Sequence, residues 1–217
     1  MRRCILSPEV GSLEVREPDI GIIVLAAGAS SRMGEPKQLL RYEKETLLGR
    51  AVRAALETRL GPVVVVLGSQ ADTMQEEIAA LDVKIVVNQY WQEGMGSSIR
   101  CGLQALETEL NGGTGAAILM LCDQPFVTSG IIRRLTDAYI ARGALVVASE
   151  YEAKGEKTLG VPALFSRALF PELMALRGAE GAKRVIACNF AKTEVITMPE
   201  AAFDIDTPDD YRALKDR

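Results

Sequence analysis

The sequence predicts an α/β fold in three layers, with a mostly parallel sheet covered by helices on both faces. First, continuous apolar runs rich in β-branched residues alternate with segments whose apolar residues recur at helical spacing. Second, 217 residues suffice for one large domain, and 48% hydrophobic and 25% charged residues are typical of soluble globular proteins. Third, a loop of small residues follows the first apolar run, where open parallel sheets bind their ligands.

Nine segments of the first 151 residues alternate between predicted strands and helices. They are strand 20–27, helix 46–58, strand 62–68, helix 71–82, strand 83–88, helix 97–110, strand 116–125, helix 128–143 and strand 144–151. The strands read as continuous apolar runs, which is typical of parallel strands buried on both faces. Serines open the helix 97–110 as good N-caps, and Gly143 ends the helix 128–143.

After residue 151 the alternation is less regular. The polar, glycine-containing segment 152–162 is predicted as a loop or hairpin over the sheet edge. The remaining predicted elements are helices 166–177 and 180–188, short strands 193–198 and 202–206, and a closing helix with Thr207 as cap and Pro208 at its first position. No repeat or linker is visible, so we expect one domain, residues 19–217, preceded by an N-terminal extension, residues 1–18.

Composition excludes several classes of function. The net charge of -4 and the lack of a basic block argue against a nucleic-acid partner. No apolar run approaches the roughly 18 residues of a membrane span, and the N-terminus lacks the apolar stretch of a signal peptide, so we expect a cytoplasmic protein without membrane contact. The four cysteines form no CxxC pair and are expected to be reduced. The absence of histidine excludes His-based triads and HExxH zinc sites.

The loop 26–37 after the first strand is predicted to bind phosphates. Its residues from Ala26 to Ser31 carry almost no side-chain bulk, so backbone N–H groups can approach phosphate oxygens. Arg32 and Lys37 add positive charge. The loop is neither GxGxxG nor a P-loop, because Gln38 follows Lys37. The alternative is an ordinary turn of small residues with two solvated charges.

Two aspartates are candidates for holding a metal ion beside these phosphates. Asp123 ends a buried strand, and Asp206 precedes the last helix. Paired carboxylates together with phosphates are a usual way to bind Mg²⁺, which keeps several waters. Asp204 is an alternative to Asp206, because alternate residues of a strand share a face. Turn formation by Asp123 and a position beside an ordinary helix cap for Asp206 are the competing interpretations.

The segment LAAGASSRMGEPKQLL (25–40) resembles the signature loop of nucleotidyltransferases, which move a nucleoside monophosphate from a triphosphate onto a phosphorylated acceptor. The chain is most similar to the MobA-like NTP transferase family, in particular to its branch of molybdenum cofactor cytidylyltransferases, over residues 20–217. The resemblance implies a Rossmann-like nucleotidyltransferase fold with Mg²⁺ as cofactor. It implies that Gly28, Arg32 and Lys37 bind the triphosphate, while Ala27 favours CTP over GTP.

Further site residues are implied by the same resemblance. Asp123 and Asp206 match the metal aspartates of a DxP and a DTPED segment, and the catalytic set becomes Arg32, Lys37 and Asp123. NQYWQEGMGSSIRCGL (88–103) matches a segment that borders base and ribose. The implied nucleotide-binding residues are Leu25, Ala26, Ala27, Gly28, Lys37, Ser97, Ser98 and Asp123. Trp91 is interpreted as a packing anchor rather than a stacking platform, and Arg100 either reaches a phosphate or lies on a solvated helix face.

The segment 160–185 resembles the part of the family that faces the acceptor, with departures at Val161, Ala179-Glu180 and Lys183. Lys183 and Arg184 either meet an acceptor phosphate or lie on the helix surface. The resemblance implies transfer of CMP from CTP to molybdopterin or molybdenum cofactor, with release of pyrophosphate and delivery of the product to a molybdoenzyme. Alternatives are GTP as donor, a sugar or polyol phosphate such as methylerythritol phosphate as acceptor, and a non-catalytic cofactor chaperone.

Overall fold

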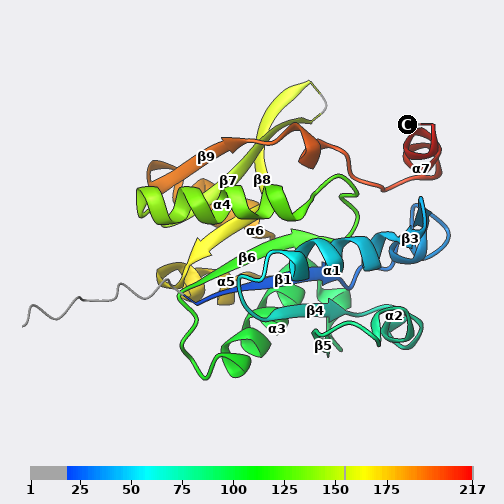
Figure 1. The fold of residues 1–217 in the computed structure, drawn as a ribbon, viewed down its shortest axis with the longest axis horizontal. Coiled ribbons are helices and arrows are strands. Elements are labelled where there is room, and N and C mark those ends of the chain that lie inside the picture. Colours follow the sequence, from blue (N-terminus) through cyan, green and yellow to red (C-terminus); the bar gives the residue numbers. More distant parts are fainter. Residues whose placement is uncertain (1–18, 154, 217) are drawn as a thin grey trace, which may run out of the picture.

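A computed structural model describes residues 19–153 and 155–216, so the predicted extension 1–18 lies outside the described residues. The centre of the molecule is a seven-stranded sheet (Figure 1) in the order β5-β4-β1-β6-β8-β7-β9. Its strands are β1 (Ile20–Ala26), β4 (Val63–Leu67), β5 (Lys84–Val87), β6 (Ala116–Leu121), β7 (Val146–Ala153), β8 (Glu156–Ser166) and β9 (Thr193–Thr197). All strand pairs are parallel except those of β8 with β6 and β7. A separate hairpin pairs β2 (Arg41–Tyr42) with β3 (Glu45–Thr46).

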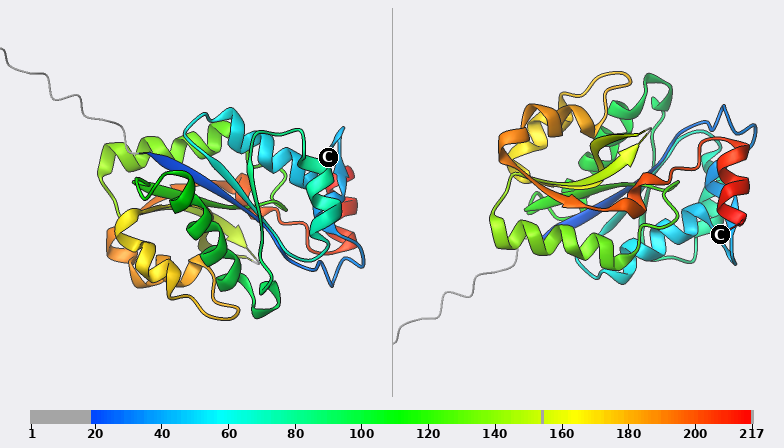
Figure 2. Two further views of the ribbon diagram at one scale, coloured as in Figure 1. Left: turned by 90° about the horizontal axis from the view of Figure 1, so that it is seen from below. Right: turned by 90° about the horizontal axis from the view of Figure 1, so that it is seen from above.

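Helices cover both faces of this sheet, as the two views of Figure 2 show. The α-helices are α1 (Leu47–Glu57), α2 (Ala71–Ile78), α3 (Met95–Glu109), α4 (Ser129–Arg142), α5 (Phe170–Met174), α6 (Ala182–Cys188) and α7 (Pro208–Lys215). Short 3-10 helices are η1 (Lys37–Leu39), η2 (Trp91–Glu93), η3 (Arg167–Leu169), η4 (Phe190–Lys192) and η5 (Pro199–Ala202). Helices α1, α2 and α4 pack on one face, and α3, α5 and α6 on the other. The predicted three-layer α/β fold is confirmed.

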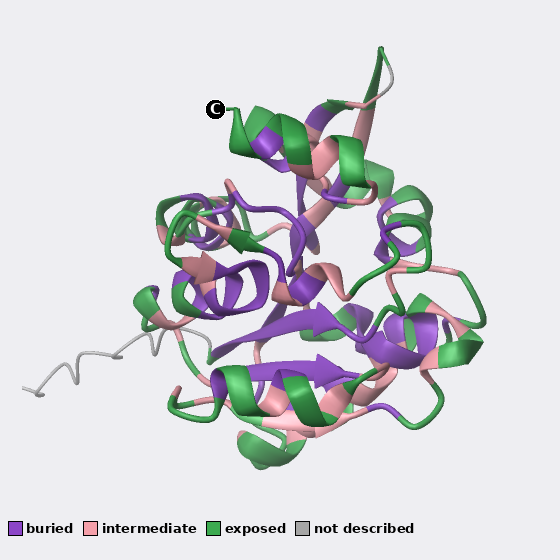
Figure 3. Ribbon diagram, turned by 90° about the vertical axis from the view of Figure 1, so that its right-hand side faces the viewer, coloured by how far each residue is buried: buried purple, intermediate pink, exposed green. Residues whose placement is uncertain are grey.

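The strands are buried on both faces, which explains their continuous apolar sequences. Along β1, Ile22 and Val24 contribute to the core beneath α1, α2 and α4, whereas Ile23 and Leu25 contribute to the core beneath α3, α5 and α6. Figure 3 shows this distribution, with buried residues concentrated in the central strands and exposed residues on the outer sides of the helices. Each strand residue therefore removes apolar surface from water on one side of the sheet or the other.

The strand order places a crevice at the carboxyl ends of β1 and β6. From β1 the chain moves outward to β4 and β5, and it then returns to the other side of β1 to form β6. Adjacent parallel strands whose connections leave in opposite directions make a topological switch point, where α/β sheets bind their ligands. The loop 27–36 follows β1 there, and Asp123 follows β6.

Helix α3 packs on the sheet at a position where only glycine fits, Gly102. A Cβ atom on this residue would lie 2.5 Å from Ile23 Cγ2 and 2.8 Å from Val66 Cγ2. Both distances are too short for nonbonded carbon atoms. The absence of a side chain therefore sets the distance between α3 and strands β1 and β4, and with it the position of the helix start beside the crevice.

The second half of the chain departs from the prediction at β8. The segment 152–162 does contain a hairpin, since Glu152 pairs with Lys157 and Ala153 with Glu156. The second arm, however, continues to Ser166 and enters the sheet between β6 and β7. Its polar beginning and Pro162 hide this strand in the sequence, because proline is rare inside central strands.

Two further predictions need correction. Residues 202–206 form no strand; the backbone N–H of Ile205 donates to Asp123 O (3.0 Å), so this segment passes the carboxyl end of the central strand β6 without pairing in the sheet. The predicted helix 166–177 is a 3-10 turn, η3, followed by the short α5. The closing helix is confirmed: Thr207 caps α7 in a capping box with Asp210, and Pro208 is its first residue. In the described part of the chain, we find no helix with the length and apolar character needed to cross a membrane.

Candidate functional site

A cavity of about 290 Å³ opens at the carboxyl ends of β1 and β6. The start of the loop after β1, the segment around η2 and the end of β6 surround it. The lining residues are Leu25, Ala26, Ala27, Gly28, Ala29, Lys37, Gln38, Trp91, Gln92, Gly94, Met95, Ser98, Leu121, Cys122 and Asp123. The loop after β1 and residues near 95–98, both predicted from the sequence as nucleotide-binding, thus line one cavity.

The loop between β1 and η1 has almost no side-chain bulk on the cavity side. A Cβ atom added at Gly28 would meet no other atom within 4 Å, so the backbone is open to a ligand there. Beyond it, Met33 and Leu40 anchor the loop in a small apolar cluster with Ile205 and Leu214. This cluster joins the loop to the segment that precedes α7 and to α7 itself. It therefore brings residues from the two ends of the chain together.

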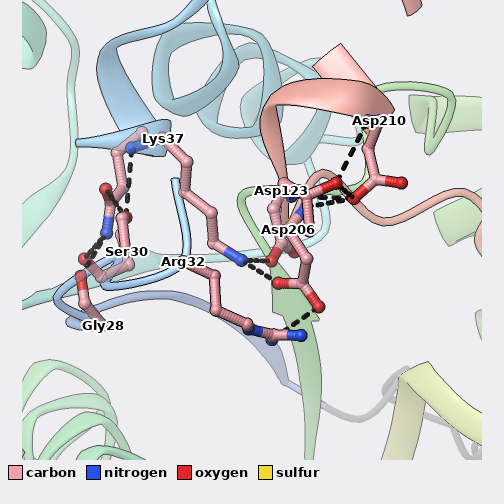
Figure 4. A network of polar contacts seen from close by, with 10 residues as sticks. Gly28, Ser30, Arg32, Lys37, Asp123, Asp206 and Asp210 are labelled. Carbon is pink, nitrogen blue, oxygen red and sulfur yellow. Dashed lines mark hydrogen bonds and ion pairs between the residues drawn. The ribbon is translucent and has the colours of Figure 1, made fainter. Parts of the chain in front are cut away.

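Four charged side chains meet beside this loop (Figure 4). Lys37 Nζ lies 2.5 Å from Asp123 Oδ2 and 2.7 Å from Asp206 Oδ1, and Arg32 Nη2 lies 2.8 Å from Asp206 Oδ2. Lys37 and Asp123 are largely buried, whereas Arg32 is exposed. The three residues predicted to be catalytic and the two predicted to hold a metal thus form one network.

The network favours the charged forms of Lys37 and Asp206. Burial by itself disfavours the ammonium group of Lys37, but the carboxylates of Asp123 and Asp206 outweigh this effect and raise its pKa. Partial burial of Asp206 likewise opposes its charge, yet Lys37 and Arg32 hold the pKa of that carboxyl below its usual value. Positive and negative charges are therefore both available where a phosphate or a cation would bind.

Asp204 differs from Asp206 in its burial, its contacts and the direction in which its pKa is shifted. It is mostly buried, its Oδ1 has no hydrogen-bond partner, and burial together with the charge of Asp123 raises its pKa to about 6. Asp206 faces Lys37 and Arg32 instead. Of the two aspartates considered from the sequence, Asp206 is the one that lies in the charged network.

The residues present fit a divalent cation that shares its coordination with phosphates and water. In the part of the chain that the structure describes, no three acidic or cysteine side chains form a ready-made metal site. Asp123 Oδ1, however, is buried without a hydrogen-bond partner, and Asp206 lies across Lys37 from it. Two carboxylates, one of which has a buried oxygen without a partner, are the donor set expected for a Mg²⁺ ion that is coordinated mainly by phosphates and water.

Comparison with known proteins identifies the family. A model of the MobA-like NTP transferase domain matches residues 22–195. The chain belongs to the MobA-like NTP transferase family. This membership places it among the nucleotidyltransferase enzymes, in agreement with the resemblance noted from residues 25–40.

Individual relatives of this MobA-like NTP transferase carry different names. It is 25% identical to the molybdenum cofactor cytidylyltransferase of Escherichia coli (strain K12), over 91% of this chain and 96% of that protein. It is 36% identical to the bifunctional protein GlmU of Kineococcus radiotolerans over 58% of this chain, and there it spans only 26% of the relative.

A solved structure supports the same relationship. The crystal structure of Rv0371c from Mycobacterium tuberculosis H37Rv superposes with a TM-score of 0.79 at 29% identity, covering 92% of this chain and 98% of that one. A second crystal structure of Rv0371c, a complex with manganese, superposes with a TM-score of 0.74 at 28% identity over 91% and 98%.

The two serines of the MobA-like NTP transferase at the start of α3 have different surroundings. Both hydroxyls accept hydrogen bonds from the buried amide of Asn88, at 2.8 Å for Ser97 and 3.1 Å for Ser98. Ser97 Oγ also lies within hydrogen-bond distance of the backbone oxygens of Tyr90 and Gly94, and only Ser98 lines the cavity. Asn88 was not singled out in the sequence; its place at the end of a predicted strand was the available signal.

Trp91 and Arg100 support the cavity wall. Trp91 packs against the core beneath α3 and also lines the cavity, so it is a packing anchor with one face available to a ligand. Arg100 donates to the backbone oxygen of Leu176 and pairs with Glu93 at 3.0 Å. These contacts join α3 to the turn after α5, which is neither of the two roles considered from the sequence.

On the other side of Asp123, the MobA-like NTP transferase places Tyr151 and Lys183 together. Lys183 Nζ lies 5.9 Å from the centre of the Tyr151 ring, and Gly160 leaves room for both side chains. Burial and the charges of Asp204 and Asp123 raise the pKa of Tyr151 to about 12. Arg184 pairs with Glu180 on the outer face of α6. Lys183, rather than Arg184, is therefore directed toward the residues around Asp123.

Proposed function

We propose that the chain is a Mg²⁺-dependent nucleotidyltransferase that moves CMP from CTP onto a phosphorylated acceptor and releases pyrophosphate. One observation carries the proposal: Arg32 and Lys37 meet Asp123 and Asp206 beside an open loop of small residues. The arrangement offers positive charge and backbone N–H groups to a triphosphate, and carboxylates to a cation.

The reaction is a substitution at the α-phosphorus of the nucleotide. An oxygen of the acceptor phosphate forms the new P–O bond, and the bond to the β-phosphate breaks with its electrons leaving on pyrophosphate. The acceptor oxygen is already ionised, so no general base is needed, in keeping with the absence of histidine. Catalysis then consists mainly of positioning and charge compensation.

The chain's own residues supply both. The loop backbone and Arg32 and Lys37 bind the phosphates, and their positive charge compensates the charge that develops on the leaving pyrophosphate. Asp123 and Asp206 would hold the Mg²⁺ ion, which when bound neutralises phosphate charge. Lys37 forms ion pairs with both carboxylates. Since its pKa is raised, it is charged when it meets the phosphates.

CTP is the proposed donor, and molybdopterin or molybdenum cofactor is the first proposed acceptor. Ala27 in the loop supports CTP, and the similarity to the molybdenum cofactor cytidylyltransferase of Escherichia coli supports both choices. A molybdoenzyme would then receive the product. The departures at Val161, Ala179-Glu180 and Lys183 lie in the segment that resembles the acceptor-facing part of the family, so the acceptor needs its own test.

Calorimetric titration with CTP, GTP, ATP and UTP, with and without Mg²⁺, tests the donor. We expect binding that depends on Mg²⁺ and is tightest for CTP. Pyrophosphate release with CTP and a panel of molybdopterin, methylerythritol phosphate and sugar phosphates then tests the acceptor. Tightest binding of GTP would move the chain to guanylyl transfer. Binding without pyrophosphate release for any acceptor would favour a cofactor chaperone, and absence of binding would overturn the proposal.

A further inference from the structure

Gln38 is a buried residue beside the loop 27–36. The proposed chemistry does not use its side-chain amide. Gln38 belongs to η1, directly after Lys37, and only 1% of its surface is exposed. A buried carboxamide costs free energy unless its donors and acceptor are satisfied. Its partners therefore show what the side chain holds in place.

The partners of Gln38 are all in the loop itself. Its Nε2 donates to Ala26 O at 3.1 Å and to Gly28 O at 2.7 Å, and its Oε1 accepts from Ser30 Oγ at 3.0 Å. Ser30 Oγ in turn accepts from the backbone N–H of Lys37 at 3.0 Å, a contact drawn in Figure 4. One side chain thus connects the beginning of the loop to the residue that carries the catalytic ammonium group.

These contacts fix the direction of two peptide groups. In a trans peptide the C=O and the following N–H point in opposite directions. When Ala26 O and Gly28 O turn toward Gln38, the N–H groups of Ala27 and Ala29 turn away from it. Ala27 and Ala29 both line the cavity. Backbone N–H groups so arranged are the donors that a phosphate needs.

We propose that Gln38 is a positioning residue that holds the loop in its phosphate-binding shape before the nucleotide arrives. The inference rests on the proposed function, since it assumes that the cavity binds a nucleoside triphosphate. A loop of alanine, glycine and serine has many conformations, and ordering it on binding would weaken affinity. Gln38 orders it in advance, and Ser30, with a φ of +54°, closes the turn.

The test compares Gln38→Met with Gln124→Met. Methionine is similar in length and has no amide. Gln124 is a matched control, because it is equally buried and its Nε2 also donates to two backbone oxygens, those of Val161 and Ala201. Calorimetry with CTP and with GTP, each with Mg²⁺, should show affinity about tenfold weaker for Gln38→Met and within about twofold of wild type for Gln124→Met. Both variants are expected to unfold at lower urea concentration.

A second readout separates positioning from stability. In ¹⁵N spectra, the amide signals of Ala27 and Ala29 should shift on addition of CTP and Mg²⁺ in the wild type and shift less in Gln38→Met at saturation. If Gln38→Met does not fold, Ser30→Ala replaces it, because this partly exposed residue links Gln38 to Lys37, and about threefold weaker binding is expected. Wild-type affinity in these variants overturns this inference alone, whereas no binding by the wild type overturns the proposed function as well.

Discussion

Lys37 occupies the position between Asp123 and Asp206 at which a cation would be expected. Its ammonium group neutralises both carboxylates and is held by them, so in the absence of a nucleotide the site contains its own counter-ion. A metal ion held by Asp123 and Asp206 would therefore compete with Lys37 for these two carboxylates. The proposed triphosphate would relieve this competition, because it would offer Lys37 another partner.

This competition predicts the effect of Lys37→Met on metal binding without nucleotide. Removal of the ammonium group frees both carboxylates, so Mn²⁺ should bind to the variant about tenfold more tightly than to the wild type, a difference of about 1.4 kcal/mol. Electron paramagnetic resonance of free Mn²⁺ measures this directly. Lys215→Met, at the end of α7, serves as a control and should leave the affinity unchanged. Equal or weaker Mn²⁺ binding by Lys37→Met would contradict the competition.

The raised pKa of Asp204 predicts that the stability of the protein depends on pH. Its pKa of about 6 in the folded protein lies above the ordinary 3.8, so the folded state holds the proton more tightly and stability falls as pH rises between these values. Asp204→Asn removes this loss. The variant should gain stability relative to the wild type from about pH 4 to about pH 6 and keep the gain above that.

Urea unfolding in the presence of EDTA measures this difference across the pH range. Asp137→Asn, at an exposed position of α4, is the control and should follow the wild type throughout. A constant difference between Asp204→Asn and the wild type at all pH values would mean that burial does not raise the pKa of Asp204.

Among the elements, α3 is the one whose packing on the sheet requires a glycine in the middle of the helix. Gly102 allows the helix to approach Ile23 and Val66, and the start of the same helix carries Met95 and Ser98 into the cavity wall. The geometry of the site is thus coupled to a contact in the middle of the helix.

Gly102→Ala should lower the free energy of unfolding by about 1–3 kcal/mol, because the added methyl group must displace a strand or the helix. Gly130→Ala is the matched control. It lies in the first turn of α4 on the surface, where a Cβ would meet only Thr128 Oγ1 at 3.7 Å. There alanine should stabilise the helix by up to about 1 kcal/mol. Urea unfolding of both variants checks the prediction, and equal effects would refute it.

For the whole molecule, the two-sided burial of the sheet predicts the reactivity of the cysteines. Cys188 is exposed, Cys101 is partly buried, and Cys122 is buried at the end of β6. Burial raises the pKa of Cys101, and burial together with the charge of Asp123 raises that of Cys122, so both remain thiols at neutral pH.

Among these three cysteines of the described residues, iodoacetamide should therefore label Cys188 first, Cys101 more slowly and Cys122 only after unfolding in urea. Peptide mapping by mass spectrometry at increasing times gives the order. Rapid labelling of Cys122 in the folded protein would contradict the packing of β6.

Most of the fold was predictable, because parallel strands buried on both faces leave continuous apolar runs in the sequence. β1 and β6 are clear examples. β8 was only partly predicted, since half of it is an exposed hairpin arm and Pro162 interrupts its pattern. The prediction of a strand at 202–206 was wrong because the pattern was misleading. Phe203 and Ile205 alternate with polar residues as in a strand, but Ile205 packs beneath α7.

The charged residues of the site were predictable from the sequence. The buried amides that position its loop and helix were not. Lys37, Asp123 and Asp206 stand out because charged residues follow buried strands or precede a helix, and the structure brings them together. Gln38 and Asn88 act by hydrogen bonds to atoms that only the fold places nearby. An isolated amide in a sequence carries no signal of such contacts.

Asp123 marks a boundary in the sequence between the residues that line the cavity and those that follow. Every residue that lines the cavity lies at or before it, whereas the antiparallel β8, with Tyr151 and Lys183 beside it, belongs to the chain that follows. Under the proposed function, the cavity for the nucleotide is lined by the first stretch of the chain, and the wall that would face the acceptor belongs to the second. Changes confined to β7, β8 and α6 would then alter the acceptor side alone, whereas Asp206 and α7 must stay as they are, because they complete the charged network and anchor the loop.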